Sequence, residues 1–128
     1  MQIALDRAPL TSGLVRSLAA ATYTVSACSA TLEPVAGEGW LAVGDAAIAR
    51  DPLSGQGIVT AMRGAVVAAK AVEDLIHGDP LALNAYAAQV RAWRRSYLAA
   101  RRKVYAGQTR WPDRPFWRRR SLGRSDAA

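Results

Sequence analysis

The residues best suited to chemistry lie at positions 40–58, in the sequence WLAVGDAAIARDPLSGQGI. The apolar run at 40–43 has the length of a strand, and Gly44 and Asp45 end it with a small residue and a carboxylate. Residues 51–57 form a loop rich in glycine and proline, and an apolar helix is predicted to follow at once. A helix start has N–H groups without partners and a positive dipole end, so it attracts anionic or electron-rich groups.

The glycines and carboxylates of this stretch favour a ligand site. Gly55 and Gly57 let the backbone approach a flat or phosphorylated ligand closely. A carboxylate at the end of a strand, as at Asp45, is well placed to accept hydrogen bonds from ligand hydroxyls. Asp51 is predicted to form a turn and cap the loop. Ser54 has two equally supported roles, which are a ligand contact and a hydrogen bond to its own backbone.

The same residues resemble a known family. GEGWLAVGDAA at 37–47 and DPLSGQGI at 51–58 resemble the second FAD-binding motif of flavoprotein monooxygenases and of the related flavin-dependent halogenases and reductases. The resemblance covers roughly residues 20–120 and is most specific in the motif. It implies an FAD site in which Asp45, after Gly44, binds a ribityl hydroxyl and Pro52 lies near the isoalloxazine ring. It also implies that the backbone of Gly55, Gln56, Gly57 and Ile58 donates to the N1/O2 edge of the flavin.

The family's chemistry resides in the flavin, which accepts hydride from NAD(P)H and activates oxygen while the protein supplies position and electrostatics. Within the family, the narrower resemblance is to enzymes that mature quinone-cofactor oxidases by hydroxylating a residue of the oxidase chain. Such enzymes begin with a strand, a GxGxxG turn and a helix, and no GxGxxG occurs in this chain. We therefore expect the C-terminal part of such an enzyme, incomplete and inactive alone, and whether the chain is itself an enzyme stays open.

Charge is distributed unevenly along the 128 residues. Residues 1–90 have five Lys or Arg and eight Asp or Glu, whereas residues 91–128 have twelve Lys or Arg and two Asp. This asymmetry suggests nucleic acid, an anionic membrane surface or an acidic protein or peptide as partner. The alternative function is then a small basic helical module that binds nucleic acid or an acidic protein partner. A solvated arginine-rich face explains the same pattern and weighs against nucleic acid. A third alternative is a truncated gene product without activity.

The expected fold is α+β and mostly helical, as the C-terminal portion of an FAD/NAD(P)-binding Rossmann-like domain with a few N-terminal strands and two long helices. Residues 1–39 are expected to return the chain from a substrate domain, residues 40–120 to complete the FAD-binding domain with a helical extension, and residues 121–128 to form a disordered tail. Strands are predicted at 22–27 and 40–43, with 29–32 continuing or pairing with the first and a hairpin-like connection at 34–39. A short helix is predicted at 14–21.

Two long helices dominate the second half of the chain. The first is predicted to start within two residues of Gly57 and to end at His77 or Gly78, because loop glycines precede it and Gly78 follows it. Its apolar positions cover so much of its surface that it should be largely buried; they are Ile58, Met62, Ala65, Val66, Ala69, Val72 and Ile76.

The second helix should open with Asp79 as N-cap and Pro80 at its first position and run to about Ala106. An apolar seam is expected at Tyr86, Val90, Trp93, Tyr97 and Val104. Residues 110–117, RWPDRPFW, are expected to be neither regular helix nor central strand. The aromatic residues Trp111, Phe116 and Trp117 should pack on the preceding helix or on the flavin domain.

Composition restricts the remaining possibilities. Cys28 is the single cysteine and is expected to be a small buried strand residue, and His77 suits a helix end. One cysteine and one histidine exclude a zinc-type site. The first residues lack the pattern of a secretory signal, and charged residues interrupt the long apolar helix. We therefore expect a cytoplasmic protein without a transmembrane segment.

Overall fold

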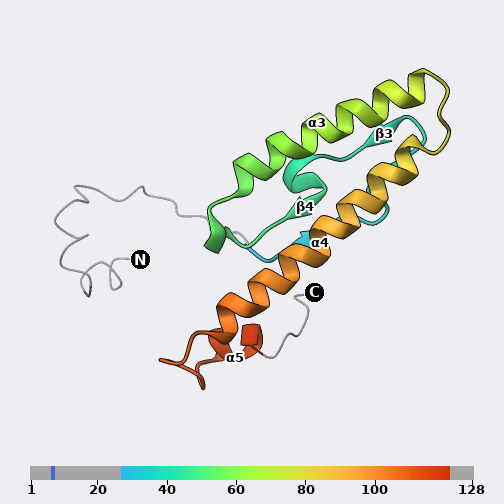
Figure 1. The fold of residues 1–128 in the computed structure, drawn as a ribbon. Coiled ribbons are helices and arrows are strands. Elements are labelled where there is room, and N and C mark those ends of the chain that lie inside the picture. Colours follow the sequence, from blue (N-terminus) through green and yellow to red (C-terminus); the bar gives the residue numbers. More distant parts are fainter. Residues whose placement is uncertain (1–6, 8–26, 122–128) are drawn as a thin grey trace, which may run out of the picture.

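A computed structural model describes residue 7 and residues 27–121 of the chain (Figure 1). The predicted helix at 14–21, residues 22–26 of the predicted strand and residues 122–128 of the predicted tail lie outside the described residues. The elements are β1 (Ala30–Thr31), β2 (Ala36–Gly37), β3 (Trp40–Leu41), η1 (Gly44–Ala46), β4 (Ile48–Ala49), η2 (Pro52–Ser54), α3 (Gly57–Ile76), α4 (Ala82–Ala106) and α5 (Pro115–Ser121).

Helices α3 and α4 run antiparallel and side by side (Figure 1). Both are rich in alanine, which has the highest helix propensity. The predicted bounds of α3 are nearly correct, because it begins at Gly57 and ends at Ile76 with His77 as C-cap. Gly78 reverses the chain with φ of +95°, a conformation that glycine adopts without strain. The predicted end of α4 is also correct, since it stops at Ala106 before Gly107.

The start of α4 lies slightly later than predicted. Leu81, not Asp79, is the N-cap residue, and the helix begins at Ala82. The Asp79 carboxylate accepts a hydrogen bond from the Leu81 N–H at 2.9 Å, so it stabilises the turn before the helix.

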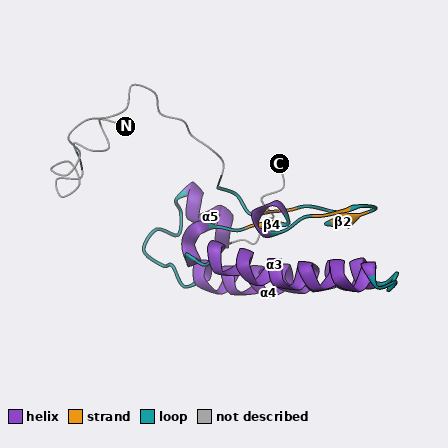
Figure 2. Cartoon of the chain, turned by 90° about the horizontal axis from the view of Figure 1, so that it is seen from above, coloured by secondary structure: helices purple, strands orange, loops and turns teal. Residues whose placement is uncertain are grey.

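The strands and connecting loops form a second layer on one face of the two helices (Figure 2). β1 pairs antiparallel with β4, with Ala30 opposite Ala49, and β2 pairs with β3 in a hairpin, with Ala36 opposite Leu41. A hairpin lies in the predicted region, but its first strand, β2, falls within the connection predicted at 34–39. Its second strand covers Trp40–Leu41 and not the whole run at 40–43.

The described residues contain these two short antiparallel pairs and no parallel sheet. The Rossmann-like assignment therefore stays a prediction, as does the division at residues 39 and 40, across which β1 pairs with β4. In the described part of the chain, no helix combines the length and apolar character needed to cross a membrane.

A small core fills the space between the two layers. Its buried members are Val35, Ala42, Ala47, Ile48, Ala68, Ala71, Tyr86 and Val90, with Trp93 packed against them. Small residues allow the layers to approach closely: a Cβ on Gly44 would lie 3.3 Å from the Cβ of Ala61. The buried Tyr86 hydroxyl donates a 2.6 Å hydrogen bond to the Ala42 carbonyl, which ties α4 to the strand layer.

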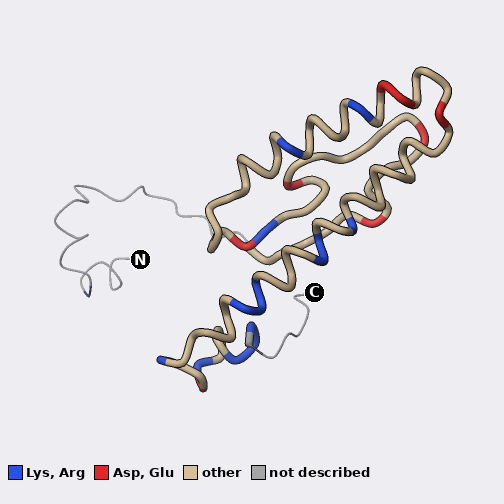
Figure 3. Tube along the Cα trace, in the orientation of Figure 1, with Lys and Arg blue, Asp and Glu red and all other residues tan. Residues whose placement is uncertain are grey.

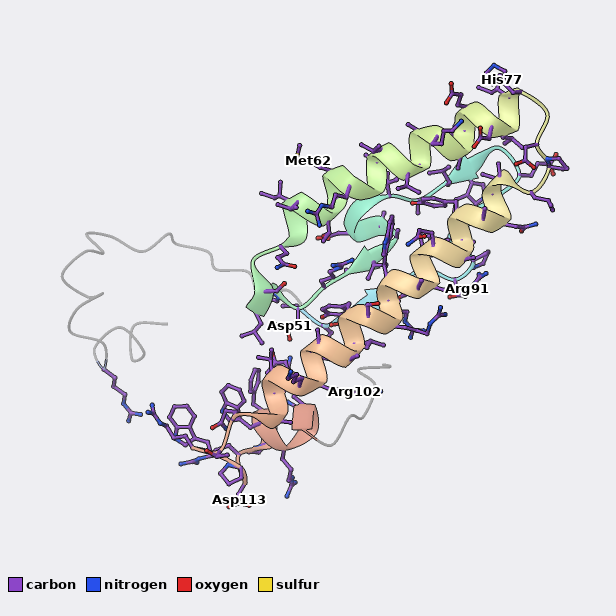
Figure 4. All side chains as sticks on the ribbon, viewed as in Figure 1. Asp51, Met62, His77, Arg91, Arg102 and Asp113 are labelled. Carbon is purple, nitrogen blue, oxygen red and sulfur yellow. The ribbon has the colours of Figure 1, made fainter. Side chains whose placement is uncertain are left out.

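The prediction that α3 is largely buried is wrong. Its buried residues are Gly64, Ala68 and Ala71, whereas Ile58, Met62, Val66 and Ile76 are 66–79% exposed. The Met62 side chain lies on the side of α3 that faces away from α4 (Figure 4). The reason is geometric, since α4 and η1 cover one face of α3 and no described segment covers the opposite face.

Three further expectations need correction. Cys28 is exposed and lies before β1, not buried in a strand. Val104 is 57% exposed, so the apolar seam of α4 ends earlier than predicted. The segment 110–117 was expected to be irregular throughout, yet Pro115 begins α5, because proline is compatible with the first turn of a helix. Ser121, assigned to the tail, is the last residue of α5.

Matched substitutions of two helix valines test this packing. Val90 is 1% exposed and Val66 is 72% exposed. We expect Val90→Ala to lower the free energy of unfolding by about 2–3 kcal/mol, because it removes two buried methyl groups and leaves a cavity. Val66→Ala should change it by less than about 0.5 kcal/mol, since alanine is the better helix former and little contact is lost. Urea unfolding of both variants measures this, and equal losses would contradict the exposed face of α3.

Candidate functional site

The loop after β4 is shaped by its own residues. Asp51 is the N-cap of η2, and its Oδ1 accepts a hydrogen bond from the Leu53 N–H at 3.0 Å, as the sequence predicts. Pro52 occupies the first position of η2. Gly55 ends it in the left-handed region, with φ of +61°, and its N–H donates to the Pro52 carbonyl at 3.0 Å. A glycine is favoured here because other residues are strained at this φ.

Helix α3 starts directly after this turn, and its first residues are exposed. Gln56 is the N-cap residue and makes no side-chain capping bond, and the Thr60 N–H donates to the Gln56 carbonyl at 3.0 Å. The N–H groups of Gly57 and Ile58 therefore have no acceptor within the helix. A Cβ placed on Gly55 or Gly57 would meet no atom within 4 Å. This open, donor-rich backbone fits the electron-rich edge of a flat ligand.

The Gly44–Asp45 pair lies in η1, which packs against the first half of α3. Gly44 has φ of +59°, and its lack of a side chain lets η1 pack closely against Ala61 of the helix. Asp45 is exposed. The fold therefore brings Gly44 and Asp45 beside the helix that carries the predicted backbone donors.

All eight predicted site residues are described. Gly44 is half-buried, and the exposed ones are Asp45, Pro52, Ser54, Gly55, Gln56, Gly57 and Ile58. The last six lie between Pro52 in η2 and Ile58 in α3, and Leu53 is the one residue of that range that was not predicted. Their exposure leaves them accessible to a ligand, and their role in binding FAD stays a prediction.

Sequence reasoning missed the partners of Asp51, which is buried between the loop and the helices of the C-terminal half (Figure 4). The Tyr105 hydroxyl donates to Asp51 Oδ2 at 2.6 Å. The Nε atoms of Arg101 and Arg120 each lie 3.7 Å from the same oxygen. These residues are 50 or more positions away in the sequence, and no local spacing links them. The single available signal was the general need of a buried carboxylate for partners.

The environment of Asp51 keeps its carboxylate charged. Burial by itself would raise the pKa of Asp51, but the Tyr105 hydroxyl, the Leu53 N–H and the two guanidinium groups together lower it below its ordinary value. The pKa of Tyr105 is raised, first by burial and then by the carboxylate to which its hydroxyl donates. The pair therefore remains a phenol and a carboxylate at neutral pH.

A second tyrosine fastens the same loop to α4. The Asp51 N–H donates to the Tyr97 hydroxyl oxygen at 2.7 Å, and that oxygen lies 2.5 Å from Ser29 Oγ. The Arg50 guanidinium lies over the Tyr97 ring, 5.4 Å from its centroid. Both sides of Asp51, backbone and carboxylate, are thus bound to α4.

Helix α5 completes the arrangement by folding back on the end of α4. The rings of Phe116 and Trp117 contact Tyr105, with centroids 6.4 and 5.9 Å away, which confirms their predicted packing on the preceding helix. Trp111 stacks on Trp117 at 6.1 Å. The Arg120 guanidinium lies 4.0 Å from the Phe116 centroid, so the aromatic cluster also places the cation that faces Asp51.

A cavity of about 540 Å³ lies between this loop and the two long helices, and we call it the loop pocket. The loop and α3 contribute Arg50, Asp51, Leu53, Ser54, Gln56, Thr60 and Arg63. The α4 wall follows one helical face and consists of Trp93, Ser96, Tyr97, Ala100, Arg101 and Val104. Its volume is in the range of small-molecule sites. The described residues contain no cluster of three or more His, Cys, Asp or Glu side chains that could hold a metal ion.

Comparison with known proteins gives one informative similarity. The chain is 33% identical over 81 residues to a protein of Marinomonas mediterranea named "Putative FAD-dependent oxidoreductase LodB". The similarity covers 63% of this chain and 21% of that protein, so the chain spans about a fifth of its relative's length. No family model matches the chain, and no solved structure matches it. The similarity supports the coarse class suggested by the motif, an FAD-dependent oxidoreductase.

The Asp51–Tyr105 contact predicts a pH-dependent stability. A carboxylate with a lowered pKa stabilises the fold fully above its ordinary value of 3.8, and this contribution is lost as pH falls towards the lower folded value. We expect Tyr105→Phe to cost about 1.5–3 kcal/mol at neutral pH, because it removes a hydrogen bond to a charged group. It should also move the acid loss of stability to higher pH. Urea unfolding over a pH series measures both effects.

Tyr86→Phe is the matched control, since the Tyr86 hydroxyl is also buried but donates to a backbone carbonyl. Loss of this hydrogen bond should lower the free energy of unfolding by about 0.5–1.5 kcal/mol at every pH. If the stability of the two variants depends on pH in the same way, the Tyr105 hydroxyl does not contribute to the lowered pKa of Asp51.

Proposed function

We propose that this chain forms the flavin-side part of the FAD site of a flavin-dependent oxidoreductase. The observation that carries the proposal is the open start of α3, where Gly55 and Gly57 leave space and the first N–H groups lack helical acceptors. The similarity to a relative named as FAD-dependent supports the choice of cofactor. The eight predicted residues fit this role because they combine exposed backbone donors with one exposed carboxylate.

In the proposed site, each group has a defined task. Asp45 accepts hydrogen bonds from ribityl hydroxyls, and the Gly57 and Ile58 N–H groups donate to the N1/O2 edge of the ring system. The positive end of α3 then favours negative charge at that edge, by about 0.3–1 kcal/mol at an exposed position. Pro52 lies along the ring, and Gly44 holds η1 against α3. FAD, when bound, would supply hydride acceptance and oxygen activation.

Within this class we propose a monooxygenase, with a halogenase-like enzyme as the related alternative. The support is the resemblance of GDAA and DPLSGQGI to the motif of those enzymes. NAD(P)H is the proposed reductant of the whole enzyme. The cationic surface of α4 and α5 suits an acidic protein or peptide as substrate, in keeping with the narrower resemblance to peptidyl hydroxylases.

The contacts of this chain alone provide modest affinity. Each hydrogen bond contributes roughly 0.5–1.5 kcal/mol net, and the helix dipole adds up to about 1 kcal/mol. A few such contacts total a few kcal/mol, whereas micromolar affinity requires about 8 kcal/mol. The ADP half of FAD is normally held by a GxGxxG turn and its helix, and that motif is absent from these 128 residues. We therefore expect millimolar binding by this chain.

Titration with FAD, followed by NMR of the ¹⁵N-labelled chain, tests the proposal. FAD should shift the amide signals of residues 55–58 and leave those of α5 unchanged. Asp45→Asn should weaken the binding about fivefold, because the neutral amide oxygen accepts a weaker hydrogen bond than the carboxylate, by about 1 kcal/mol. Asp113→Asn, which neutralises another exposed aspartate, is the matched control and should have no effect.

Two outcomes would contradict these expectations separately. Shifts confined to residues outside the loop and η1 would reject the site. Stoichiometric micromolar binding that turns the chain yellow would reject the affinity argument and show that the GxGxxG half is dispensable.

A second candidate function rests on the charge of α4 and α5. Residues 91–121 contain eleven Lys or Arg and one Asp, and these cations extend along both helices (Figure 3). Arg101 and Arg120 face Asp51, and Arg91 lies 4.0 Å from Glu33. Most of the others are exposed. This surface supports a basic module that binds an acidic partner, or nucleic acid, through charge alone.

Salt dependence tests this candidate. Binding to polyglutamate or duplex DNA should weaken steeply as salt rises, because each neutralised anion releases a counterion. Replacing Arg94 and Arg95 together by Gln should reduce the slope of log affinity against log salt by about two. Lys70→Gln is the control, since Lys70 lies on α3 and pairs there with Asp74 at 2.6 Å. Affinity that is constant with salt would exclude this mode of binding.

A further inference from the structure

The loop pocket has walls that suit a flat apolar group. The Trp93 and Tyr97 rings line it from α4, one turn apart on the same face, and Leu53 and Val104 add aliphatic surface. The Tyr97 hydroxyl already takes part in hydrogen bonds with Asp51 and Ser29, so the pocket gains mainly an apolar ring from this residue. Pockets of this kind bind ligands by apolar contact and select them through a few polar groups.

The polar groups at the pocket favour an anion. Asp51 is its one acidic lining residue, and that charge is compensated by Arg101 and Arg120. Arg50 and Arg63 remain as cations on the lining, with Arg50 held over the Tyr97 ring. Arg63 is exposed and has no ion-pair partner among the described residues. A guanidinium in this position can bind a carboxylate in a bidentate manner.

We propose that the loop pocket binds a small organic anion with a flat apolar body, such as an aromatic carboxylate. The body lies against Trp93 and Tyr97, and the anionic group pairs with Arg63, assisted by Arg50. Gln56 and Ser96 line the pocket as hydrogen-bonding groups for further polar atoms of the ligand.

This site differs from the proposed flavin site, and the inference does not rest on it. Leu53, Ser54 and Gln56 line the pocket, whereas three of the four predicted backbone donors, Gly55, Gly57 and Ile58, do not. The loop is therefore a shared wall: most of its predicted backbone donors are not part of the pocket lining, and other residues of the same loop enclose the pocket with α4. An occupant of the pocket would contact the loop that is proposed to hold the flavin.

The experiment uses the full 128-residue chain and a matched pair of probes, 2-naphthoate and its neutral amide, 2-naphthamide. In NMR titrations, 2-naphthoate should shift the Trp93 indole N–H signal and leave that of Trp111, which lies near α5, unchanged. It should bind at least about fivefold more tightly than 2-naphthamide, the effect expected of about 1 kcal/mol from one charge-assisted contact.

Arginine variants locate the anionic end. Arg63→Gln should remove most of the preference for naphthoate over naphthamide and leave naphthamide binding unchanged. Arg94→Gln is the matched control, because it removes the same charge from an exposed α4 position beside Trp93 that does not line the pocket. Both variants should unfold at the same urea concentration as the parent chain, since both side chains are exposed.

Three results would overturn the proposal. Equal affinity for both probes would show that the anionic group does not contribute to binding. An equal effect of the two arginine variants would show that Arg63 acts only through the net charge of the chain. Competition between excess FAD and naphthoate at the Trp93 signal would show that the pocket belongs to the flavin. If naphthoate binds but FAD does not shift the amide signals of residues 55–58, the pocket proposal is supported and the flavin proposal is rejected.

Discussion

The arrangement depends on one buried carboxylate. Asp51 joins three segments that are distant in sequence, since its own loop, α4 through Tyr97 and Tyr105, and α5 through Arg120 all meet at its atoms. Isolating a charge from water costs several kcal/mol unless it is fully hydrogen-bonded and paired. Here Oδ1 accepts the Leu53 N–H and Oδ2 accepts the Tyr105 hydroxyl. The Nε atoms of Arg101 and Arg120, each 3.7 Å from Oδ2, add ion pairs. The geometry of the loop is thus set by the contacts of Asp51, whereas a Cβ on Gly55 or Gly57 would meet no atom within 4 Å.

This explains why a chain with a small core can hold a defined loop. The layers pack through alanine and glycine, which bring backbones close but bury little apolar area. The polar network around Asp51 and the aromatic cluster of Tyr105, Phe116 and Trp117 add order at the end of α4 where the core is absent. Side chains of the C-terminal half position the loop. The basic helices α4 and α5 therefore have a structural role at the proposed flavin site, in addition to any role of their charge in binding a partner.

The sequence predicted those features that depend on neighbouring residues. The ends of α3, the hairpin at 36–41 and the capping role of Asp51 follow from glycine, proline and aspartate chemistry within a few positions. Predictions from the sequence were wrong or missing where a feature depends on segments that are distant in the sequence. The apolar residues of α3 suggested burial, but the described chain covers one face only. Pro115 suggested an interruption, although its neighbours let it begin a helix. Tyr105, Arg101 and Arg120 could not be assigned to Asp51 because nothing local marks a contact over 50 residues.

The β2–β3 hairpin makes the residue types that fit at one of its positions depend on the residue at another. The Trp40 indole lies over Gly37 so closely that a Cβ there would be 2.7 Å from its Nε1 atom. A larger residue at 37 is compatible only with a displaced or smaller residue at 40. Homologous sequences with a larger residue at 37 should therefore have a smaller or displaced residue at 40, and a variant library needs to change the two positions together only where it enlarges residue 37.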